Sequence, residues 1–419
     1  MRIAVVGSGG REHAILTALN KSKDAEKLFA IPGNAGMADI ATLIPVKVMD
    51  FEGIYQAVKE NAIDLVFVAP DDPLAAGLVD FLEDKGIRAF GPHKNAAIIE
   101  GSKAFSKDFM QRHGIPTAEY AAFDDYDKAR AYLQTAAYPL VIKADGLALG
   151  KGVIICPNLP SAESALSEMM IDKVFSSAGD RVVIEEFLTG SEVSVLTFTD
   201  GKTVKVMPSS QDHKRAFDND KGPNTGGMGA FSPSPLYTEE VADYTLKNII
   251  IPTVDGMREE GREFRGVLYF GLMLTPSGVK VLEYNARFGD PETQAVLPLL
   301  ESDFLEIINA VIDGKLADVD IKWAKKSAVT VVVASGGYPT NVIKGYPIKI
   351  ETLSPSLTLF HAGTAEKNGE LVTNGGRVFA LTAIADSIGA ARKAVYSEID
   401  KITFTDARYR KDIGIKYGE

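Results

Sequence analysis

Short apolar runs alternate with longer mixed stretches through the first hundred residues. Runs of strand length stand at 2–6, 27–31, 64–69 and 87–91. Helices are expected between them at about 11–21, 53–61 and 74–85. Strands that alternate with helices form right-handed βαβ units on a parallel sheet. The pattern therefore predicts a Rossmann-like α/β domain over residues 1–102.

Strand pairs replace this alternation after residue 102. A helix is expected at 102–114, with Ser102 as its N-cap and Gly114 just past its end. Pairs of strands are expected in 139–156, 181–201 and 264–289. Strands joined by short connectors pair in antiparallel fashion. An α+β body is therefore predicted over 103–322.

Residues from about 323 onward form a third region that is rich in strands. The segments "AVTVVVASGGYP", "LTLFHAGTA" and "GGRVFALTAIA" precede an expected helix near 387–401. A small C-terminal α+β domain is predicted over 323–419.

Composition narrows the class of protein. The 419 residues carry a net charge of −11, which argues against a surface that coats nucleic acid. The only cysteine is Cys156, so no internal disulfide is possible and a reducing compartment fits. The apolar run at 328–334 is far too short to span a membrane, and no secretory signal is visible. We expect a cytoplasmic protein without nucleic-acid or membrane partners.

The loop "VVGSGGREHA" joins the first strand to the first helix. Gly7, Gly9 and Gly10 let the backbone approach an anion, and a helix N-terminus attracts one. A dinucleotide fingerprint needs a small residue where Glu12 stands, and the second strand ends without the expected acid. The loop favours a substrate phosphate, with a purely structural turn as the alternative.

A second glycine-rich loop, "KADGLALGKGV", follows Lys143. Only three residues separate Gly146 from Gly150, and Gly152 follows Lys151, so the loop is not a Walker A motif. A lid that folds over phosphates and a flexible surface hairpin fit the pattern equally well.

Two further segments carry candidate chemistry. "VIEEFLTGSEVSV" places Glu185, Glu186 and Glu192 around a connector that can face a planar base and a ribose, although strand-end glutamates are often merely solvated. "QDHKRAFDNDKGPNTGGMGAFSP" (211–233) is a long, polar, glycine-rich connection, and such connections are often functional.

The stretch "VLEYNARFGDPETQ" (281–294) ends a strand in charged residues. Glu283, Asn285 and Arg287 share one face if the strand persists. Oxygen ligands from Glu and Asn suit Mg²⁺, and an arginine beside them can stabilise phosphoryl charge. The alternative is a salt-bridged turn in which Arg287 pairs with Asp290 or Glu292.

Together these segments resemble the ATP-grasp superfamily and, within it, the phosphoribosylamine–glycine ligase (glycinamide ribonucleotide synthetase) family. The resemblance covers essentially the whole chain. It rests on "GGREHA" (9–14), "PGNAG" (32–36), "EGSKAFSKDFM" (100–110), "KADGLALGKGV" (143–153), "QDHKRAFDNDKGPNTGGMGA" (211–230), "EYNARFGDPETQ" (283–294) and "NGGRV" (374–378). It implies that the body is an ATP-grasp fold with a lid subdomain at about 118–187.

The resemblance also implies a reaction. Glycine and 5-phosphoribosylamine would be joined to glycinamide ribonucleotide, with ATP converted to ADP and phosphate through glycyl phosphate. This step belongs to de novo purine biosynthesis and would use Mg²⁺ or Mn²⁺. The implied partners are these small molecules, and the expected state is a monomer.

Site roles follow from the resemblance residue by residue. Glu283 and Asn285 match metal ligands, Arg287 matches the residue that stabilises the transferring phosphoryl group, and Lys151 in the lid is the second catalytic candidate. Nucleotide contacts are implied for Lys103, Lys143, Gly146, Gly150, Gly152, Glu185, Glu186, Phe187, Leu188 and Glu192. Substrate contacts are implied for Gly9, Gly10, Arg11, Asp71, Asp212, Lys214 and Arg215.

The chain departs from the common patterns at two positions. Gly271 stands where most ATP-grasp enzymes carry another acidic metal ligand, a gap that this family shares. Asp71 stands where the family usually has glutamate, so its carboxylate reaches one methylene less far. Another ATP-grasp carboxylate–amine ligase and a non-catalytic nucleotide-binding protein remain the alternatives.

Overall fold

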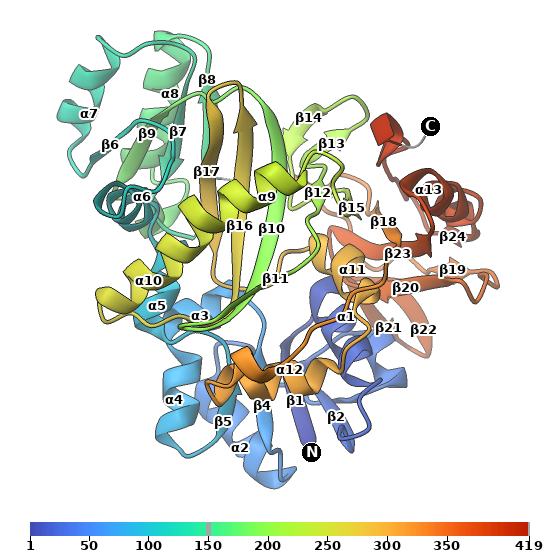
Figure 1. Cartoon of the computed structure of the whole chain (residues 1–419). Coiled ribbons are helices and arrows are strands. Elements are labelled where there is room, and N and C mark those ends of the chain that lie inside the picture. The colour runs from blue at the N-terminus through green and yellow to red at the C-terminus, as the bar shows by residue number, and fades with distance from the viewer. Residues whose placement is uncertain (148–151, 418–419) are drawn as a thin grey trace.

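The computed structural model describes residues 1–147 and 152–417. Three sheet-based parts meet around a common centre (Figure 1), and the C-terminal sheet takes two of its strands from residues 211–232 in the middle of the chain. They confirm the predicted combination of a Rossmann-like part, a central antiparallel body and a C-terminal α+β part. None of the helices in the described residues has the length and apolar character of a membrane span.

The N-terminal part is a parallel sheet with the strand order β3-β2-β1-β4-β5. Its strands are β1 (Arg2–Gly7), β2 (Lys27–Pro32), β3 (Thr42–Leu43), β4 (Leu65–Val68) and β5 (Arg88–Phe90). Its helices are α1 (Gly10–Leu19), α2 (Phe51–Glu60), α3 (Asp71–Ala76), α4 (Leu78–Asp84) and α5 (Lys94–Gly101). The chain order reverses between β1 and β4, and ligands bind at the carboxyl ends of strands at such a point. Arg11 and Asp71 both follow strands at this edge.

The prediction of a single helix at 74–85 is wrong, because two shorter helices occupy that region. They break at Gly77, whose φ of +95° suits a residue without a side chain. The first of them, α3, begins at Asp71 directly after β4, so this carboxylate stands in the first helical turn.

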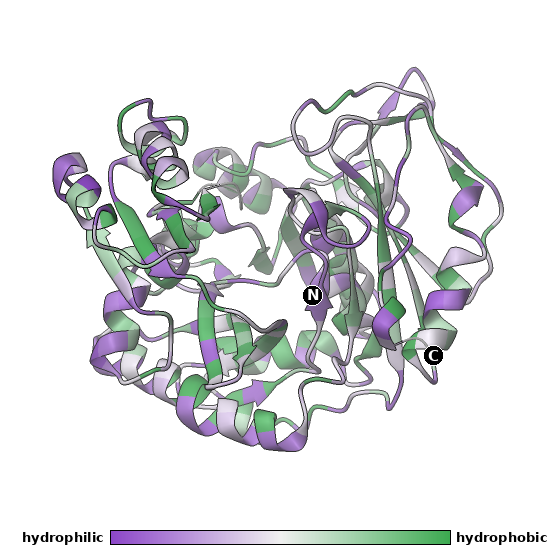
Figure 2. Cartoon of the chain, turned by 90° about the horizontal axis from the view of Figure 1, so that it is seen from above, coloured by the Kyte–Doolittle hydropathy of each residue, from purple (hydrophilic) through white to green (hydrophobic). Residues whose placement is uncertain are grey.

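The central body contains two four-stranded antiparallel sheets, in the orders β6-β9-β7-β8 and β11-β10-β16-β17. The first comprises β6 (Tyr120–Phe123), β7 (Leu140–Ala144), β8 (Val153–Cys156) and β9 (Val182–Glu186), with α7 (Tyr126–Leu133) and α8 (Leu159–Met170). The second comprises β10 (Ser191–Asp200), β11 (Val204–Val206), β16 (Arg265–Thr275) and β17 (Gly278–Asn285). Helices α9 (Glu239–Thr245), α10 (Ile251–Glu259), α11 (Glu292–Val296) and α12 (Phe304–Ile312) complete the body. Figure 2 shows that the strands are mostly apolar, whereas the outer helices carry both polar and apolar residues.

Helix α6 (Lys103–Arg112) starts and stops as predicted. The Ser102 side chain accepts a hydrogen bond from the Phe105 amide, and Gly114 follows the helix with a φ of +64°. This cap fixes the first turn, which carries Lys103.

The C-terminal part is a five-stranded sheet with the order β12-β15-β18-β23-β20. Its strands are β12 (Gln211–Asp212), β15 (Gly229–Ser232), β18 (Ser327–Ala334), β20 (Leu357–His361) and β23 (Arg377–Ala385), and α13 (Ile388–Tyr396) packs on it. Shorter pairs are β13 (Arg215–Phe217) with β14 (Lys221–Asn224), β19 (Lys349–Ile350) with β24 (Ile402–Thr403), and β21 (Thr364–Lys367) with β22 (Glu370–Thr373). The long polar connection at 211–233 is thus tied to this sheet, because β15 pairs along Ala328–Val331 and all its residues are buried.

Phenylalanine side chains join the N-terminal sheet to the body. Phe288, which is 1% exposed, lies with its ring centre 6.3 Å from that of Phe67 and 6.0 Å from those of Phe198 and Phe304. Aromatic pairs at such spacing add to the free energy of area burial. Because Phe288 directly follows Arg287, this packing fixes the backbone of the predicted catalytic arginine.

We expect Phe288→Ala to lower the free energy of unfolding by about 3–5 kcal/mol, because it opens a cavity between two parts of the fold. Thermal unfolding of the whole chain measures this as a lower Tm. Phe217→Ala is the matched control, since Phe217 is 46% exposed. Equal losses in the two variants would contradict the role given to Phe288.

Candidate active site

A large cavity lies where the three parts meet. Its volume is about 1580 Å³, beyond the roughly 300–1,000 Å³ of typical small-molecule sites. It therefore has room for a nucleotide together with smaller substrates. The predicted site residues that line it are Gly9, Arg11, Asp71, Lys103, Lys143, Gly152, Glu185, Glu186, Phe187, Leu188, Glu192, Asp212, Lys214, Arg215, Glu283, Asn285 and Arg287.

The other predicted site residues are Gly10, Gly146, Gly150 and Lys151. Gly10 does not line the cavity, because it packs against Gln294: a Cβ at Gly10 would lie 2.5 Å from the amide nitrogen of that side chain. Gly146 is not among the lining residues either, but its carbonyl accepts a hydrogen bond from Lys103 Nζ. Gly150 and Lys151 lie outside the described residues.

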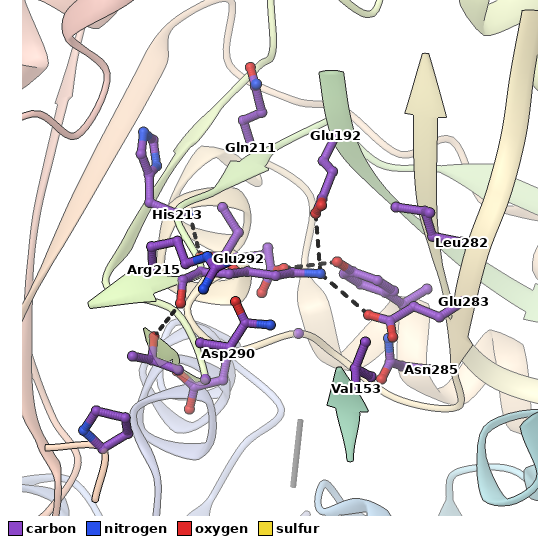
Figure 3. A pocket seen from close by; sticks show the side chains of 18 of the residues that line it. Val153, Glu192, Gln211, His213, Arg215, Leu282, Glu283, Asn285, Asp290 and Glu292 are labelled. Atoms are coloured by element: carbon purple, nitrogen blue, oxygen red, sulfur yellow. Dashed lines mark hydrogen bonds and ion pairs between the residues drawn. The ribbon is translucent and has the colours of Figure 1, made fainter. Parts of the chain in front are cut away.

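Strand β17 delivers the two predicted metal ligands. Glu283 and Asn285 are two residues apart on the strand and line the same cavity (Figure 3). The strand ends at Asn285, so Arg287 lies in the following loop, where its Nη2 donates to Asn285 Oδ1 at 2.9 Å. Opposite Glu283 stands Gly271, and a Cβ there would come within 3.1 Å of the Glu283 side chain. The missing acid at Gly271 thus leaves room for Glu283.

Arg287 forms an ion pair with Glu100, with Nη2 and Oε1 2.7 Å apart, and a longer one with Asp71 at 3.8 Å. The alternative pairing with Asp290 or Glu292 is wrong. Burial raises the pKa of Glu100 to about 7 although Arg287 opposes this. Burial alone would lower the pKa of Arg287, but the Glu100 and Asp71 carboxylates outweigh burial and raise this pKa. The guanidinium is therefore charged and held from the N-terminal side.

Lys214 lies between two carboxylates on neighbouring walls. Its Nζ is 3.3 Å from Glu192 Oε2 and 3.5 Å from Glu283 Oε1. Lys214, aided by Lys143, lowers the pKa of Glu283 to about 2. Glu283 is therefore a carboxylate at any physiological pH, as a metal ligand must be.

The residues present fit a divalent cation. Glu283 supplies a charged oxygen and Asn285 a neutral one, and both line the cavity. No cluster of three or more His, Cys, Asp or Glu side chains suited to a metal occurs within 1–147 and 152–417. A sparse oxygen set suits Mg²⁺, which keeps waters and binds substrate phosphates.

Two lysines project from the opposite wall. Lys143 Nζ lies 2.9 Å from Glu185 Oε1 and donates to the Leu282 carbonyl at 3.2 Å. Lys103 Nζ donates to the Gly146 carbonyl at 2.9 Å, and burial lowers the pKa of Lys103. The ammonium groups of both lysines therefore lie near β17, at the side of the cavity where β7 ends.

The two glutamates that end β9, just before the connector to β10, have different partners. Glu185 is buried and faces the lysines, whereas Glu186 pairs with Lys280 at 2.6 Å. The connector residues that follow, from Phe187 to Gly190, line the cavity. This wall presents backbone and apolar groups suited to a planar base.

The N-terminal loop is less open than the sequence suggests. Glu12 accepts the Gly9 amide at 2.6 Å, and Asp290 accepts the Arg11 amide at 3.3 Å. The Arg11 guanidinium contacts Glu12 and donates to the Phe288 carbonyl at 3.1 Å. The amides of Gly9 and Arg11, which were expected to face a phosphate, therefore donate to carboxylates of the protein. The binding of a phosphate by this loop stays a prediction.

The segment around β12 and β13 contributes one acid, Asp212, and two basic residues, Lys214 and Arg215, to the cavity. Burial, followed by the neighbouring Glu292 carboxylate, raises the pKa of Asp212. Glu292 itself accepts from the Tyr269 hydroxyl at 3.0 Å. Arg215 donates to the Gly222 carbonyl at 2.8 Å within its own hairpin.

Sequence reasoning gave no role to Glu100, Lys107 and Arg377, which all line the cavity. Arg377 Nη1 donates to the carbonyls of Gly226 and Asp290, at 2.7 Å and 2.6 Å, and so ties three loops together. All three stand in segments quoted above: Glu100 and Lys107 in 100–110, and Arg377 in 374–378. Lys107 follows Lys103 by four residues on α6, a spacing that places both on one helix face.

Comparison with known proteins follows the same division of the chain. Family models described as phosphoribosylglycinamide synthetase match residues 1–100 (N domain), 101–293 (ATP-grasp domain) and 328–416 (C domain). The phosphoribosylamine–glycine ligase of Listeria monocytogenes is 48% identical, with 99% of this chain and 100% of that protein covered.

Solved structures agree. The crystal structure of the phosphoribosylamine–glycine ligase of Thermotoga maritima is 35% identical with a TM-score of 0.87, covering 99% of this chain and 100% of that one. The biotin carboxylase domain of a Hydrogenobacter thermophilus 2-oxoglutarate carboxylase, in complex with MgADP, shares the fold at 18% identity with a TM-score of 0.75, covering 97% and 91% of the two chains. The chain belongs to the phosphoribosylamine–glycine ligase family of ATP-grasp enzymes, ligases of purine biosynthesis.

Proposed function

We propose that the cavity described above joins glycine to 5-phosphoribosylamine, with ATP along the β9–β10 connector. The glycine carboxylate attacks the γ-phosphorus of ATP, and ADP leaves. The amine of phosphoribosylamine then attacks the carbonyl carbon of glycyl phosphate. Inorganic phosphate leaves, the amine loses a proton, and the amide of glycinamide ribonucleotide forms.

The single observation that carries this proposal is the end of β17. Glu283, Asn285 and Arg287 stand there within a few residues, with Lys143 reaching the Leu282 carbonyl of the same strand. Phosphoryl transfer needs positioning and stabilisation of charge more than covalent help from the protein. Fixed cations at one strand end supply both.

Each chain residue has a distinct task in this scheme. Glu283 and Asn285 would hold Mg²⁺, which when bound neutralises charge on phosphate oxygens. Arg287 stabilises charge on the transferring group, and Lys103 and Lys143 orient the nucleotide phosphates. Glu192 accepts from the ribose of ATP, while Arg11, Asp71, Asp212, Lys214 and Arg215 surround glycine and phosphoribosylamine.

Further features of the proposal rest on the family and the chain's composition. We place the domains at 1–102, 103–322 and 323–419, with the lid subdomain at about 118–187. The oxygen-only donor pair suits Mg²⁺ or Mn²⁺. One free, buried cysteine fits the reducing cytoplasm, and the expected state remains a monomer.

The reaction is tested by ADP release from the purified chain with ATP and Mg²⁺. Release is expected only when both glycine and phosphoribosylamine are present. Release that depends on another acid or amine would favour a different ATP-grasp ligase. No release with any pair would favour a nucleotide-binding protein.

We expect Arg287→Ala to lower kcat by at least about a hundredfold, the scale for loss of one preorganised charge stabiliser. Mg·ADP should still bind, because the connector and both lysines are intact. Arg287→Lys keeps the charge without the two-pronged contact and should retain more activity. Near-normal turnover of Arg287→Ala would refute the role.

Glu283→Gln should raise the Mg²⁺ concentration needed for half-maximal activity, because it removes the charged ligand. Glu192→Gln is the matched control, since Glu192 also pairs with Lys214 but carries no metal role. Glu192→Gln should reach half-maximal activity at the same Mg²⁺ concentration as wild type. Any effect of this variant should appear in the KM for ATP instead. Identical metal titrations for Glu283→Gln and wild type would count against Glu283 as a ligand.

A further inference from the structure

Lys107 is a buried lysine of α6 to which the scheme above gives no task. Its side chain is 2% exposed although it lies at the cavity wall. Its Nζ lies 3.0 Å from Glu185 Oε2 and donates to Thr117 Oγ1 at 2.8 Å. Helix α6, which carries Lys107, packs beside β9 and β17; Figure 1 shows where it lies in the body.

Glu185 serves two lysines at once. Its Oε2 faces Lys107, and its Oε1 lies 2.9 Å from Lys143 Nζ. All three side chains are at most 9% exposed, so water screens these contacts little. Two ammonium groups and one carboxylate leave a net charge of +1 beside the cavity.

A second set of contacts links Lys107 to the strand of the metal ligands. Thr117 Oγ1, which accepts from Lys107, donates to the Val281 carbonyl at 2.7 Å. Lys143 donates to the next carbonyl, that of Leu282. Lys107 therefore connects α6, β9 and β7 with the part of β17 just before Glu283.

We propose that Lys107 is a positioning residue for ATP: it holds one oxygen of Glu185, so that Lys143 keeps its place at Leu282 and its charge toward the nucleotide phosphates. This inference rests on the proposed function. Without Lys107, one carboxylate would neutralise one lysine, and the local charge would fall from +1 to 0. Weaker binding of a polyanionic nucleotide follows.

The protonation of Lys107 gives this role a pH signature. Burial lowers the pKa of Lys107 to about 8, although Glu185 opposes the shift. The other charged groups that face it are Lys143 on β7 and Glu186 on β9. As pH rises through about 8, Lys107 becomes neutral and the +1 charge is lost. Nucleotide affinity should therefore decline above that pH.

The test compares wild type with Lys107→Met, Lys107→Arg and the surface control Lys128→Met. Calorimetric binding of Mg·ADP is measured between pH 7 and 9.5, and the KM for ATP and kcat are measured at pH 7.5. Lys107→Met should weaken ADP binding and raise the KM for ATP by about tenfold, with kcat within about threefold of wild type. Lys107→Arg cannot deprotonate in this range and should lack the alkaline decline seen in wild type. Lys128→Met should match wild type throughout.

Equal ADP affinity of Lys107→Met and wild type would overturn the positioning role, as would an alkaline decline that persists in Lys107→Arg. Thermal unfolding of each variant identifies a loss of fold, and Lys107→Arg still tests the pH signature if Lys107→Met is unstable. Failure of wild type to bind Mg·ADP would contradict the proposed function itself. Normal wild-type binding with an unaffected Lys107→Met would contradict only the inference.

Discussion

The site depends on where β17 ends and on what anchors the chain just beyond it. The strand brings Glu283 and Asn285 to the cavity, and Phe288 then enters an aromatic cluster shared by the N-terminal sheet and the body. Arg287 stands between these two fixed points, with Glu100 and Asp71 against its guanidinium. A charged group held in this way is oriented before substrate arrives, which is what stabilisation of transferring charge requires.

The cavity wall alternates acids and bases, and this arrangement sets their protonation. Lys214 keeps Glu283 ionised, and Arg287 lies against the buried Glu100. Charged groups removed from water are costly unless they are paired. The partners come from different parts of the chain: Asp71 of α3 lies near Arg287, and Arg377 of the C-terminal sheet pairs with Asp290. The site is therefore complete only where all three parts meet.

Local signals were enough to predict most of the architecture. The parallel N-terminal sheet, the Ser102 cap and the strand pairs of 139–156 and 264–289 follow from spacing and capping residues. The expected pair in 181–201 is wrong, because β9 and β10 lie in different sheets. Contacts between distant segments were not predictable in this way. Nothing in the sequence near Arg287 indicates its partner Glu100. The pairing of β15 with β18 likewise depends on a strand almost a hundred residues away. Motifs identified the family, but only the fold shows which charges meet.

The central claim is that this cavity makes glycyl phosphate before it makes the amide. Glycine labelled with ¹⁸O in its carboxylate tests it most directly, with mass analysis of the phosphate released on turnover with ATP and phosphoribosylamine. Attack of the carboxylate on the γ-phosphorus, then loss of phosphate from the carbonyl carbon, must transfer a carboxylate oxygen to phosphate. We expect one ¹⁸O in each phosphate formed. Unlabelled phosphate, with product formed at the normal rate, would contradict the account.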